Sequence, residues 1–107
     1  PSLLPAYPGL DTHEKVLSNK DPYHGISIHY VSSELDAGPL IAQGIIKVGK
    51  DEKLNNIIER IHKIEHLLLP EIIKEICNNN IYLDNEEVKF LNISLNNQKL
   101  IKKSYEI

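Results

Sequence analysis

Methionine and tryptophan are both absent from the 107 residues, and cysteine and phenylalanine each occur once. A single cysteine excludes an internal disulfide framework and suits a reducing compartment. No apolar run approaches the roughly 20 residues that a transmembrane helix needs. The first residues also lack the basic flank and apolar core of a signal peptide. We therefore expect a cytoplasmic protein that does not associate with membranes.

The chain also lacks an excess of basic residues. Its 12 Lys and Arg are outnumbered by 15 Asp and Glu, which gives a net charge of −3. A surface that binds nucleic acid usually gathers positive charge into a patch, whereas the basic residues here are scattered. We expect no nucleic acid partner. The 41% hydrophobic and 25% charged residues are typical of a globular chain, and no linker divides it into two domains.

Motifs for phosphate loops and paired-cysteine metal sites are missing as well. His62 and His66 lie four residues apart, a spacing that places two imidazoles on one helix face. No third ligand accompanies them, so we predict no metal. The one cysteine, Cys77, follows an apolar helical run, and we expect it to be a buried thiol without a catalytic role.

Proline dominates the beginning of the chain. Residues 1–9 hold three of the six prolines, and proline fixes φ and removes a backbone donor. A structured loop is therefore expected here. Asp11 or Thr12 can cap a short helix over 13–18.

Two β-strands and a terminal hairpin are expected from the residue pattern. Alternating apolar and polar residues predict a strand around 26–32, and a β-rich apolar run predicts a second one at 40–48. Gly44, inside the second strand, indicates a bulge or a close approach. Near the end, 81–83 and 88–91 predict a β-hairpin. The last dozen residues are polar, and we expect them to be ordered only by docking.

A long helix about 52–78 is expected between the strands and the hairpin. Apolar residues recur there at three- and four-residue steps, which gives one apolar stripe. Asp51 is a plausible N-cap, and Pro70 is expected to kink or restart the helix. The order of elements is that of an α/β fold.

Asp36 lies in a loop between the two strands, followed by Gly38 and Pro39. An Asp in such a loop often bonds nearby backbone amides. The same carboxylate can also serve in chemistry, and the residue pattern of the loop alone does not decide between the two.

Several motifs resemble folate-dependent formyltransferases in the same order along the chain. They are Pro1 to His13, His24-Gly25, Ser27 to Val31, Leu35 to Ile41, Glu65-His66 and Leu69-Pro70. Gly9 to His13 and the Glu65-His66 pair favour the branch that acts on glycinamide ribonucleotide. The resemblance implies that 1–107 is the C-terminal half of a formyltransferase domain with a Rossmann-like fold. The nucleotide-binding half, which ends with an Asn-x-His just before Pro1, is absent from these residues.

The resemblance also implies an activity. Such enzymes transfer a formyl group from 10-formyltetrahydrofolate to the amine of glycinamide ribonucleotide in purine biosynthesis, without a metal. The chain would need its N-terminal half as a partner, and we expect it to be inactive alone. The alternatives are a formyltetrahydrofolate hydrolase, another formyltransferase, or a folate-binding module without catalysis.

The same resemblance assigns roles to individual residues. Asp36 matches the family's catalytic carboxylate. The segment that lines the folate site matches Ser32, Ser33, Glu34, Leu35 and Asp36, and the substrate-binding positions match Pro1, His62, Lys63, Ile64 and Glu65. His29 either faces the site or fills the sheet, and the sequence leaves both open.

Overall fold

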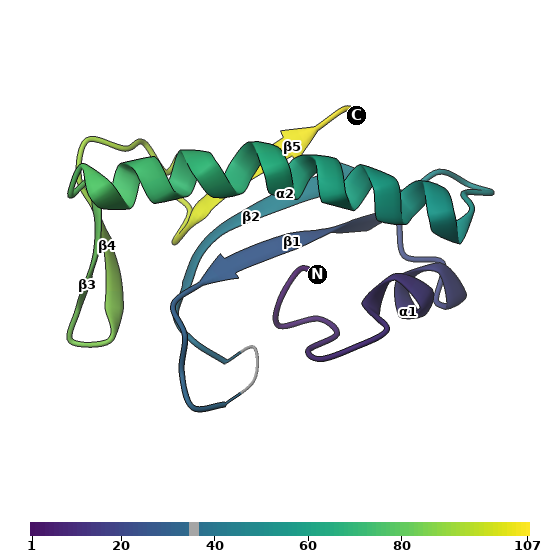
Figure 1. Ribbon diagram of the computed structural model, residues 1–107, viewed down its shortest axis with the longest axis horizontal. Coiled ribbons are helices and arrows are strands. Elements are labelled where there is room, and N and C mark those ends of the chain that lie inside the picture. Colours follow the sequence, from purple (N-terminus) through teal and green to yellow (C-terminus); the bar gives the residue numbers. More distant parts are fainter. Residues whose placement is uncertain (35–36) are drawn as a thin grey trace.

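The computed structural model describes residues 1–34 and 37–107, which form a mixed sheet, a hairpin and two helices (Figure 1). This arrangement confirms the α/β fold expected from the sequence. The elements in chain order are α1 (Thr12–Ser18), β1 (Tyr23–His29), β2 (Leu40–Lys47), α2 (Leu54–Cys77), β3 (Ile81–Asp84), β4 (Glu87–Phe90) and β5 (Ile101–Tyr105).

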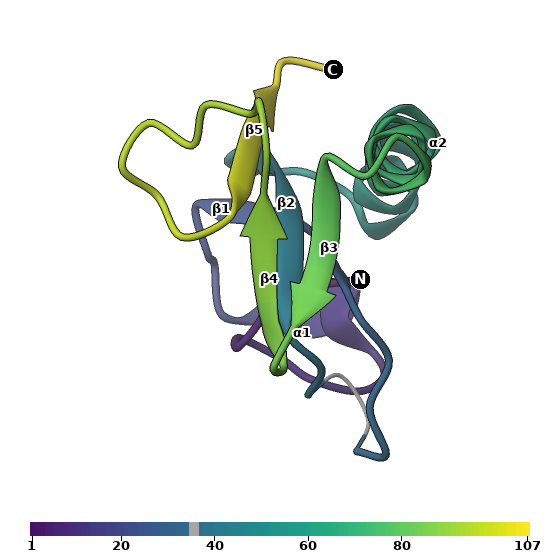
Figure 2. The ribbon, with the colours of Figure 1, turned by 90° about the vertical axis from the view of Figure 1, so that its left-hand side faces the viewer.

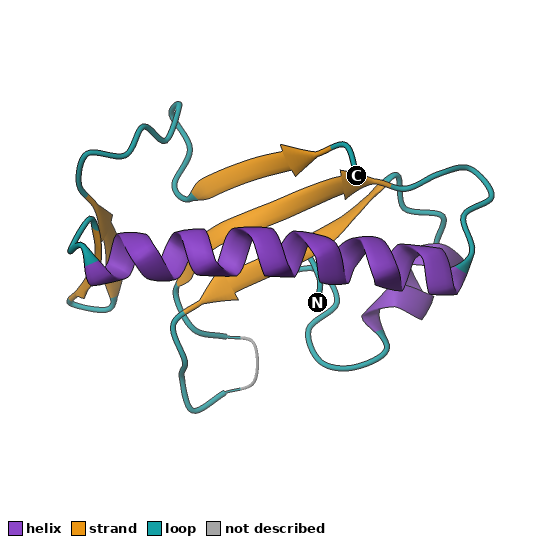
Figure 3. Cartoon of the chain, turned by 45° about the horizontal axis from the view of Figure 1, so that its top comes forward, coloured by secondary structure: helices purple, strands orange, loops and turns teal. Residues whose placement is uncertain are grey.

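The sheet has the strand order β1-β2-β5, with β1 at one end (Figure 3). β1 pairs antiparallel with β2, and β5 pairs parallel with β2. Ile26 faces Gly44 across the first pair, and Ser27 faces Gln43. Because side chains alternate along a strand, these two pairs point to opposite faces of the sheet.

Helix α2 covers one of these faces. Its apolar stripe is fully buried, and a Cβ placed on Gly44 would lie 3.2 Å from the Leu68 side chain and 3.4 Å from that of Ile64. The close approach expected at Gly44 is thereby confirmed. The residues of the stripe are Ile57, Ile61, Ile64, Leu68 and Ile72. Burial of each such side chain contributes about 1.5–3 kcal/mol.

The start and the middle of α2 differ from expectation. The N-cap position is Lys53, without a side-chain cap, so the prediction of Asp51 was wrong. Glu52 instead accepts the Gly49 N–H at 2.8 Å and pairs with Arg60 at 2.5 Å, which ties the turn to the helix. Pro70 lies inside an uninterrupted helix, because the buried stripe continues on both sides of it and packing outweighs the local cost.

The C-terminal part holds the predicted hairpin and a strand that the sequence did not predict. The hairpin β3–β4 is confirmed. It lies beyond the end of the sheet in Figure 1 and in front of the sheet in Figure 2. The last residues were expected to be ordered only by docking, but β5 pairs with β2 from Ile101 to Tyr105. The sequence of β5 lacks the alternating apolar pattern of a strand, because Lys102 and Lys103 are exposed at a sheet edge. Cys77 is exposed at the end of α2, so the prediction of a buried thiol was also wrong.

In the part of the chain that is described, neither helix has the length and apolar character needed to cross a membrane.

Close packing of β1 on β2 gives a first prediction. A Cβ at Gly25 would lie 1.9 Å from the carbonyl oxygen of Gly44 and 2.7 Å from the Leu3 side chain. Since a backbone oxygen cannot rotate away, Gly25→Ala is expected to lower the free energy of unfolding by about 1–3 kcal/mol. Urea-induced unfolding followed by circular dichroism measures this.

Gly49→Ala is the matched control, because its Cβ would meet only the flexible Glu52 side chain at 3.4 Å or more. An equal loss in both variants would show that the close approach at Gly25 is unimportant.

Candidate functional site

A cavity of about 360 Å³ opens between β1, α2 and the beginning of the chain. Apolar residues supply most of the lining, and Glu65, His29 and Ser27 are its polar residues. The lining residues are Pro1, Ile26, Ser27, Ile28, His29, Val31, Glu65 and Leu69. A mostly apolar hollow with a few converging polar groups is typical of a small-molecule site.

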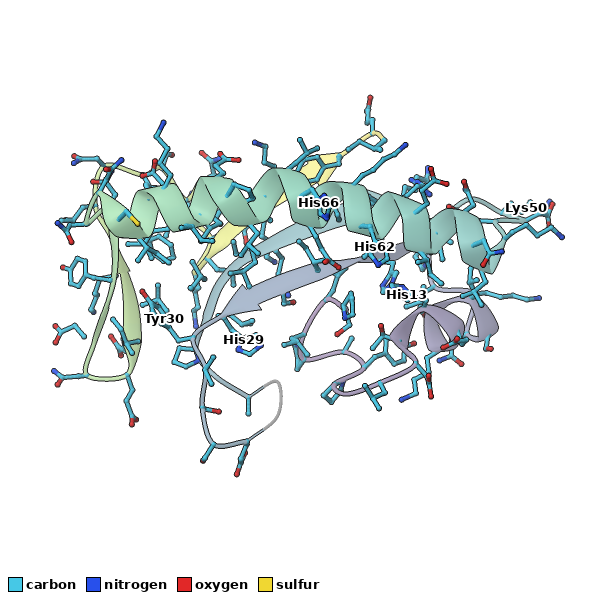
Figure 4. All side chains as sticks on the ribbon, viewed as in Figure 1. His13, His29, Tyr30, Lys50, His62 and His66 are labelled. Atoms are coloured by element: carbon cyan, nitrogen blue, oxygen red, sulfur yellow. The ribbon has the colours of Figure 1, made fainter. Side chains whose placement is uncertain are left out.

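The predicted substrate-binding residues divide between this cavity and other surroundings. Pro1 and Glu65 both line the cavity, although they are 64 positions apart. His62 and Lys63 lie exposed on α2, where Figure 4 labels His62 beside His13. The Ile64 side chain is fully buried in the core. Of the predicted substrate-binding residues on α2, Glu65 is therefore the one that lines the cavity together with Pro1.

The loop after β1 is closed at its neck. The Tyr30 N–H donates to the Pro39 carbonyl at 3.0 Å, and a Cβ at Gly38 would lie 1.6 Å from the Tyr30 carbonyl oxygen. The Ser32 hydroxyl bonds the backbone of Glu34 at 3.0 Å. Of the predicted folate-binding residues, Ser32, Ser33 and Glu34 lie in this loop, whereas Leu35 and the predicted catalytic Asp36 fall outside the described residues.

His29 ends β1 at the edge of the cavity. The strand register shifts between Ile28 and His29, so that Ile41 of β2 is passed over. Such a bulge re-aims the side chains that follow it. The ring Nδ1 lies 2.9 Å from the Tyr30 carbonyl oxygen, and the side chain lines the cavity (Figure 4). His29 thus lies at the cavity, and a role for it in the site stays a prediction.

A second histidine pair lies beneath α2. His24 is only 1% exposed, and its Nε2 lies 3.0 Å from Nδ1 of His13. Burial lowers the pKa of His24 to about 4, and repulsion from His13 in its protonated form acts in the same direction. Burial also lowers the pKa of His13. Both rings are neutral at pH 7, which leaves one nitrogen to donate and the other to accept.

Side chains rather than a strand hold the beginning of the chain on the sheet. The Ser27 hydroxyl donates to the Ser2 carbonyl at 2.8 Å and accepts the Leu4 N–H at 2.9 Å. The Gln43 amide donates to the Leu4 carbonyl at 2.8 Å and to Ser27 Oγ at 3.1 Å. Sequence reasoning missed this network. Its signal was a glutamine in the middle of an otherwise apolar strand.

Thr12 adds a second attachment near the cavity. Its buried hydroxyl donates to the Pro1 carbonyl instead of capping α1. Asp11 occupies the N-cap position in a left-handed conformation without a side-chain cap bond. Neither residue therefore provides the expected side-chain cap, and Thr12 instead fixes Pro1.

Metal binding finds no geometric support in residues 1–34 and 37–107, where no three His, Cys, Asp or Glu side chains are grouped to hold an ion. His62 and His66 remain a pair on the helix surface.

Comparison with protein families supplies an independent view of the site. The family model of the formyl transferases matches residues 1–73. The phosphoribosylglycinamide formyltransferase of Escherichia coli is 45% identical over 73 residues, which cover 68% of this chain and 34% of that protein. The Bacillus subtilis protein of the same name is 42% identical over 76 residues, 71% of this chain and 39% of that protein. The matched segment thus spans little more than a third of these curated relatives.

Solved structures extend the similarity to the C-terminal elements. The phosphoribosylglycinamide formyltransferase of Coxiella burnetii superposes with a TM-score of 0.83 at 34% identity over 96% of this chain and 48% of that one. The Anaplasma phagocytophilum protein gives 0.83 at 30% identity, over 95% and 49%. A formyltetrahydrofolate deformylase of Pseudomonas syringae shares the fold, with a TM-score of 0.79 at 22% identity over 85% of this chain and 30% of that one.

Proposed function

The chain belongs to the formyl transferase family, and we propose that it is the C-terminal half of a phosphoribosylglycinamide formyltransferase. In this role it helps transfer a formyl group from 10-formyltetrahydrofolate to the amine of glycinamide ribonucleotide. The observation that carries the proposal is the meeting of Pro1 and Glu65 at one cavity, within the segment that is 45% identical to the Escherichia coli enzyme. Both residues are family positions for the nucleotide substrate.

Glu65 is the residue to which we assign the ribose of the nucleotide. Ionised carboxylates accept hydrogen bonds only, and a vicinal diol offers two hydroxyl donors. Pro1 lies across the cavity from the helix that carries Glu65. His62, Lys63 and Ile64 support the same end of the substrate as members of one helical turn before Glu65. Ile64 does so through the core, where it fixes the turn against Gly44.

The folate substrate is assigned to the loop that follows β1. Backbone amides and carbonyls of Ser32 to Asp36 suit a pterin ring, whose edge alternates donors and acceptors. The closed neck between Tyr30 and Pro39 supports this assignment, since a ring is recognised best by groups that are already fixed.

Asp36 takes the role of the catalytic carboxylate. The substrate amine attacks the formyl carbon, an oxyanion develops, and protons move from the amine to the departing folate nitrogen. A carboxylate beside a histidine favours the imidazolium, which stabilises the oxyanion and transfers protons. In the family that histidine belongs to the Asn-x-His that precedes the position of Pro1.

The N-terminal half of the enzyme is the partner that we propose for the open edge of β1. Within the described residues β1 is the last strand of the sheet on one side, since it pairs with β2 and with no other strand. An unpaired strand edge presents backbone donors and acceptors to an incoming strand.

A reducing cytoplasm is the compartment we propose, because an exposed lone thiol such as Cys77 persists there without oxidation.

A joined enzyme tests the function. It consists of the N-terminal half of the Escherichia coli relative followed by residues 1–107 of this chain. We expect the purified protein to formylate glycinamide ribonucleotide with consumption of 10-formyltetrahydrofolate, whereas residues 1–107 alone are inactive. A folded joined enzyme that only hydrolyses the folate would favour the hydrolase alternative, and one that binds folate without either reaction would favour the binding module.

The role of Glu65 gives a further prediction. Glu65→Gln replaces a charged acceptor by a neutral amide, and hydrogen bonds to charged groups contribute about 1.5–3 kcal/mol. We expect KM for glycinamide ribonucleotide to rise about 30-fold in the joined enzyme, with KM for the folate nearly unchanged. Glu59→Gln, on the exposed surface of the same helix, is the control. A similar rise in both variants would remove Glu65 from the site.

A further inference from the structure

Gln43 is buried, yet it lines neither the cavity beside Pro1 nor the loop assigned to folate. It lies at the centre of β2 and points to the face opposite α2, together with Ser27. Burial of an amide is costly unless its hydrogen bonds are made. The contacts of this side chain therefore show what it does.

Both donors of the Gln43 amide are used. One hydrogen goes to the Leu4 carbonyl at 2.8 Å and the other to Ser27 Oγ at 3.1 Å. The same hydroxyl accepts the Leu4 N–H at 2.9 Å. With two donors directed at it, the oxygen has one proton left to give, and this proton goes to the Ser2 carbonyl at 2.8 Å. The Ser27 hydroxyl thus has three partners, and Gln43 is one of the two donors that orient it.

The segment that this network holds has no regular secondary structure. Residues 1–6 neither join a strand nor form a helix, so backbone ladders do not fix them. The backbone N–H and carbonyl of Leu4 are instead both bonded to sheet side chains, and Ser2 is held through its carbonyl. Removal of the Gln43 amide would leave the Leu4 carbonyl without that donor and would take from the Ser27 hydroxyl one of its three hydrogen-bond partners.

Pro1 is one residue from this attachment and lines the cavity. Its own carbonyl is held by Thr12. A displacement of Ser2 to Leu4 from the sheet is transmitted through one planar peptide unit to Pro1, and through the Pro1 nitrogen to whatever residue is bonded to it. In the joined enzyme that residue is the end of the Asn-x-His segment.

We propose that Gln43 is a positioning residue of the formyl transfer, which acts through Ser27 and Leu4 to place Pro1 and the catalytic segment bonded to it. This inference rests on the proposed function. Gln43 does not touch the substrates. Its effect is on the geometry in which bound substrates react, and a misplacement of about 1 Å can cost about 100-fold in rate.

Gln43→Met in the joined enzyme tests the proposal, because methionine keeps the length of the side chain and removes both donors. We expect kcat to fall about 100-fold while KM for each substrate changes by less than about 3-fold. The amide hydrogen of Leu4 should also exchange with solvent at least about tenfold faster, since the Leu4 carbonyl loses its donor and the acceptor Ser27 Oγ loses one of the groups that orient it.

Ile46→Val is the matched control, since Ile46 is buried on the same strand but faces α2. Assays at equal temperature intervals below each melting midpoint separate positioning from general destabilisation. A kcat that stays within 3-fold of the parent in Gln43→Met, or falls equally in the control, overturns the proposal while leaving the function intact. An inactive parent enzyme contradicts the function instead. In that case the exchange rate of the Leu4 amide hydrogen still shows whether Gln43 holds residues 1–6 on the sheet.

Discussion

Asp36→Asn is expected to lower kcat of the joined enzyme about 1,000-fold, within the range that a positioned acid–base group contributes. Asparagine keeps the size of the side chain and removes the charge. The catalytic imidazolium then loses the neighbour that raises its pKa, so less of it is protonated at neutral pH. We expect the activity of the variant to fall more steeply with rising pH than that of the parent, as steady-state kinetics between pH 6 and 9 would show.

Asp51→Asn supplies the control for Asp36, because Asp51 is an exposed carboxylate in the turn between β2 and α2, outside both proposed substrate sites. Both variants remove one negative charge, so an effect of the overall charge would appear in both. Near-normal turnover of Asp36→Asn with an unchanged circular dichroism spectrum would exclude Asp36 from the mechanism. Loss of folate binding with normal kcat at saturation would make it a binding residue only.

The elements with strong periodicity were predictable from the sequence. The strands around 26–32 and 40–48 and the helix about 52–78 are present, with bounds that shift by up to three residues. Their apolar residues repeat at the spacing that buries one face, and this signal does not depend on distant contacts. Strand β5 was missed because its pairing with β2 is made across half the chain and its Lys102 and Lys103 conceal the strand pattern.

The candidate site was predictable only where the resemblance named a position. The resemblance named both Pro1 and Glu65, and the fold places them at one cavity. It did not indicate that Gln43 and Ser27 hold the backbone beside Pro1, because this depends on which face of the sheet each residue takes. The face that each residue takes depends on the strand register, the bulge and the path of the loop together, and a local residue pattern does not predict these.

The buried pair of His24 and His13 leads to the second large effect, a loss of stability in mild acid. His24 lies on β1 and is nearly inaccessible, with His13 of α1 at 3.0 Å from its ring nitrogen. Burial, and to a smaller extent His13, lower its pKa to about 4, and Asp21 opposes them. In the unfolded chain the pKa of a histidine is about 6.5.

The sign of the effect follows from these two pKa values. Below about pH 6.5 the unfolded chain binds a proton at His24 that the folded chain does not accept until about pH 4. The stability from the neutral ring is therefore fully present above pH 6.5 and decreases as the pH falls. Its loss reaches about 3 kcal/mol near pH 4, at about 1.4 kcal/mol per pH unit. His13, whose pKa is also lowered, adds in the same direction.

Urea unfolding of the chain at half-unit steps from pH 7.5 to 4.5 measures this loss. The window ends at 4.5 because of Glu52. Burial raises the pKa of this carboxyl, but Arg60, Gly49 and Asn56 together hold it below its usual value, so that its contribution is lost only at lower pH. His24→Gln keeps a polar group beside His13 but does not titrate, so its stability should decline much less over the same window. His66→Gln, an exposed histidine of α2, should retain the full decline. If the free energy of unfolding fell equally with pH in the parent and in His24→Gln, the folded protein would take up a proton at His24 as readily as the unfolded chain does. The pKa of His24 would then not be lowered by its surroundings.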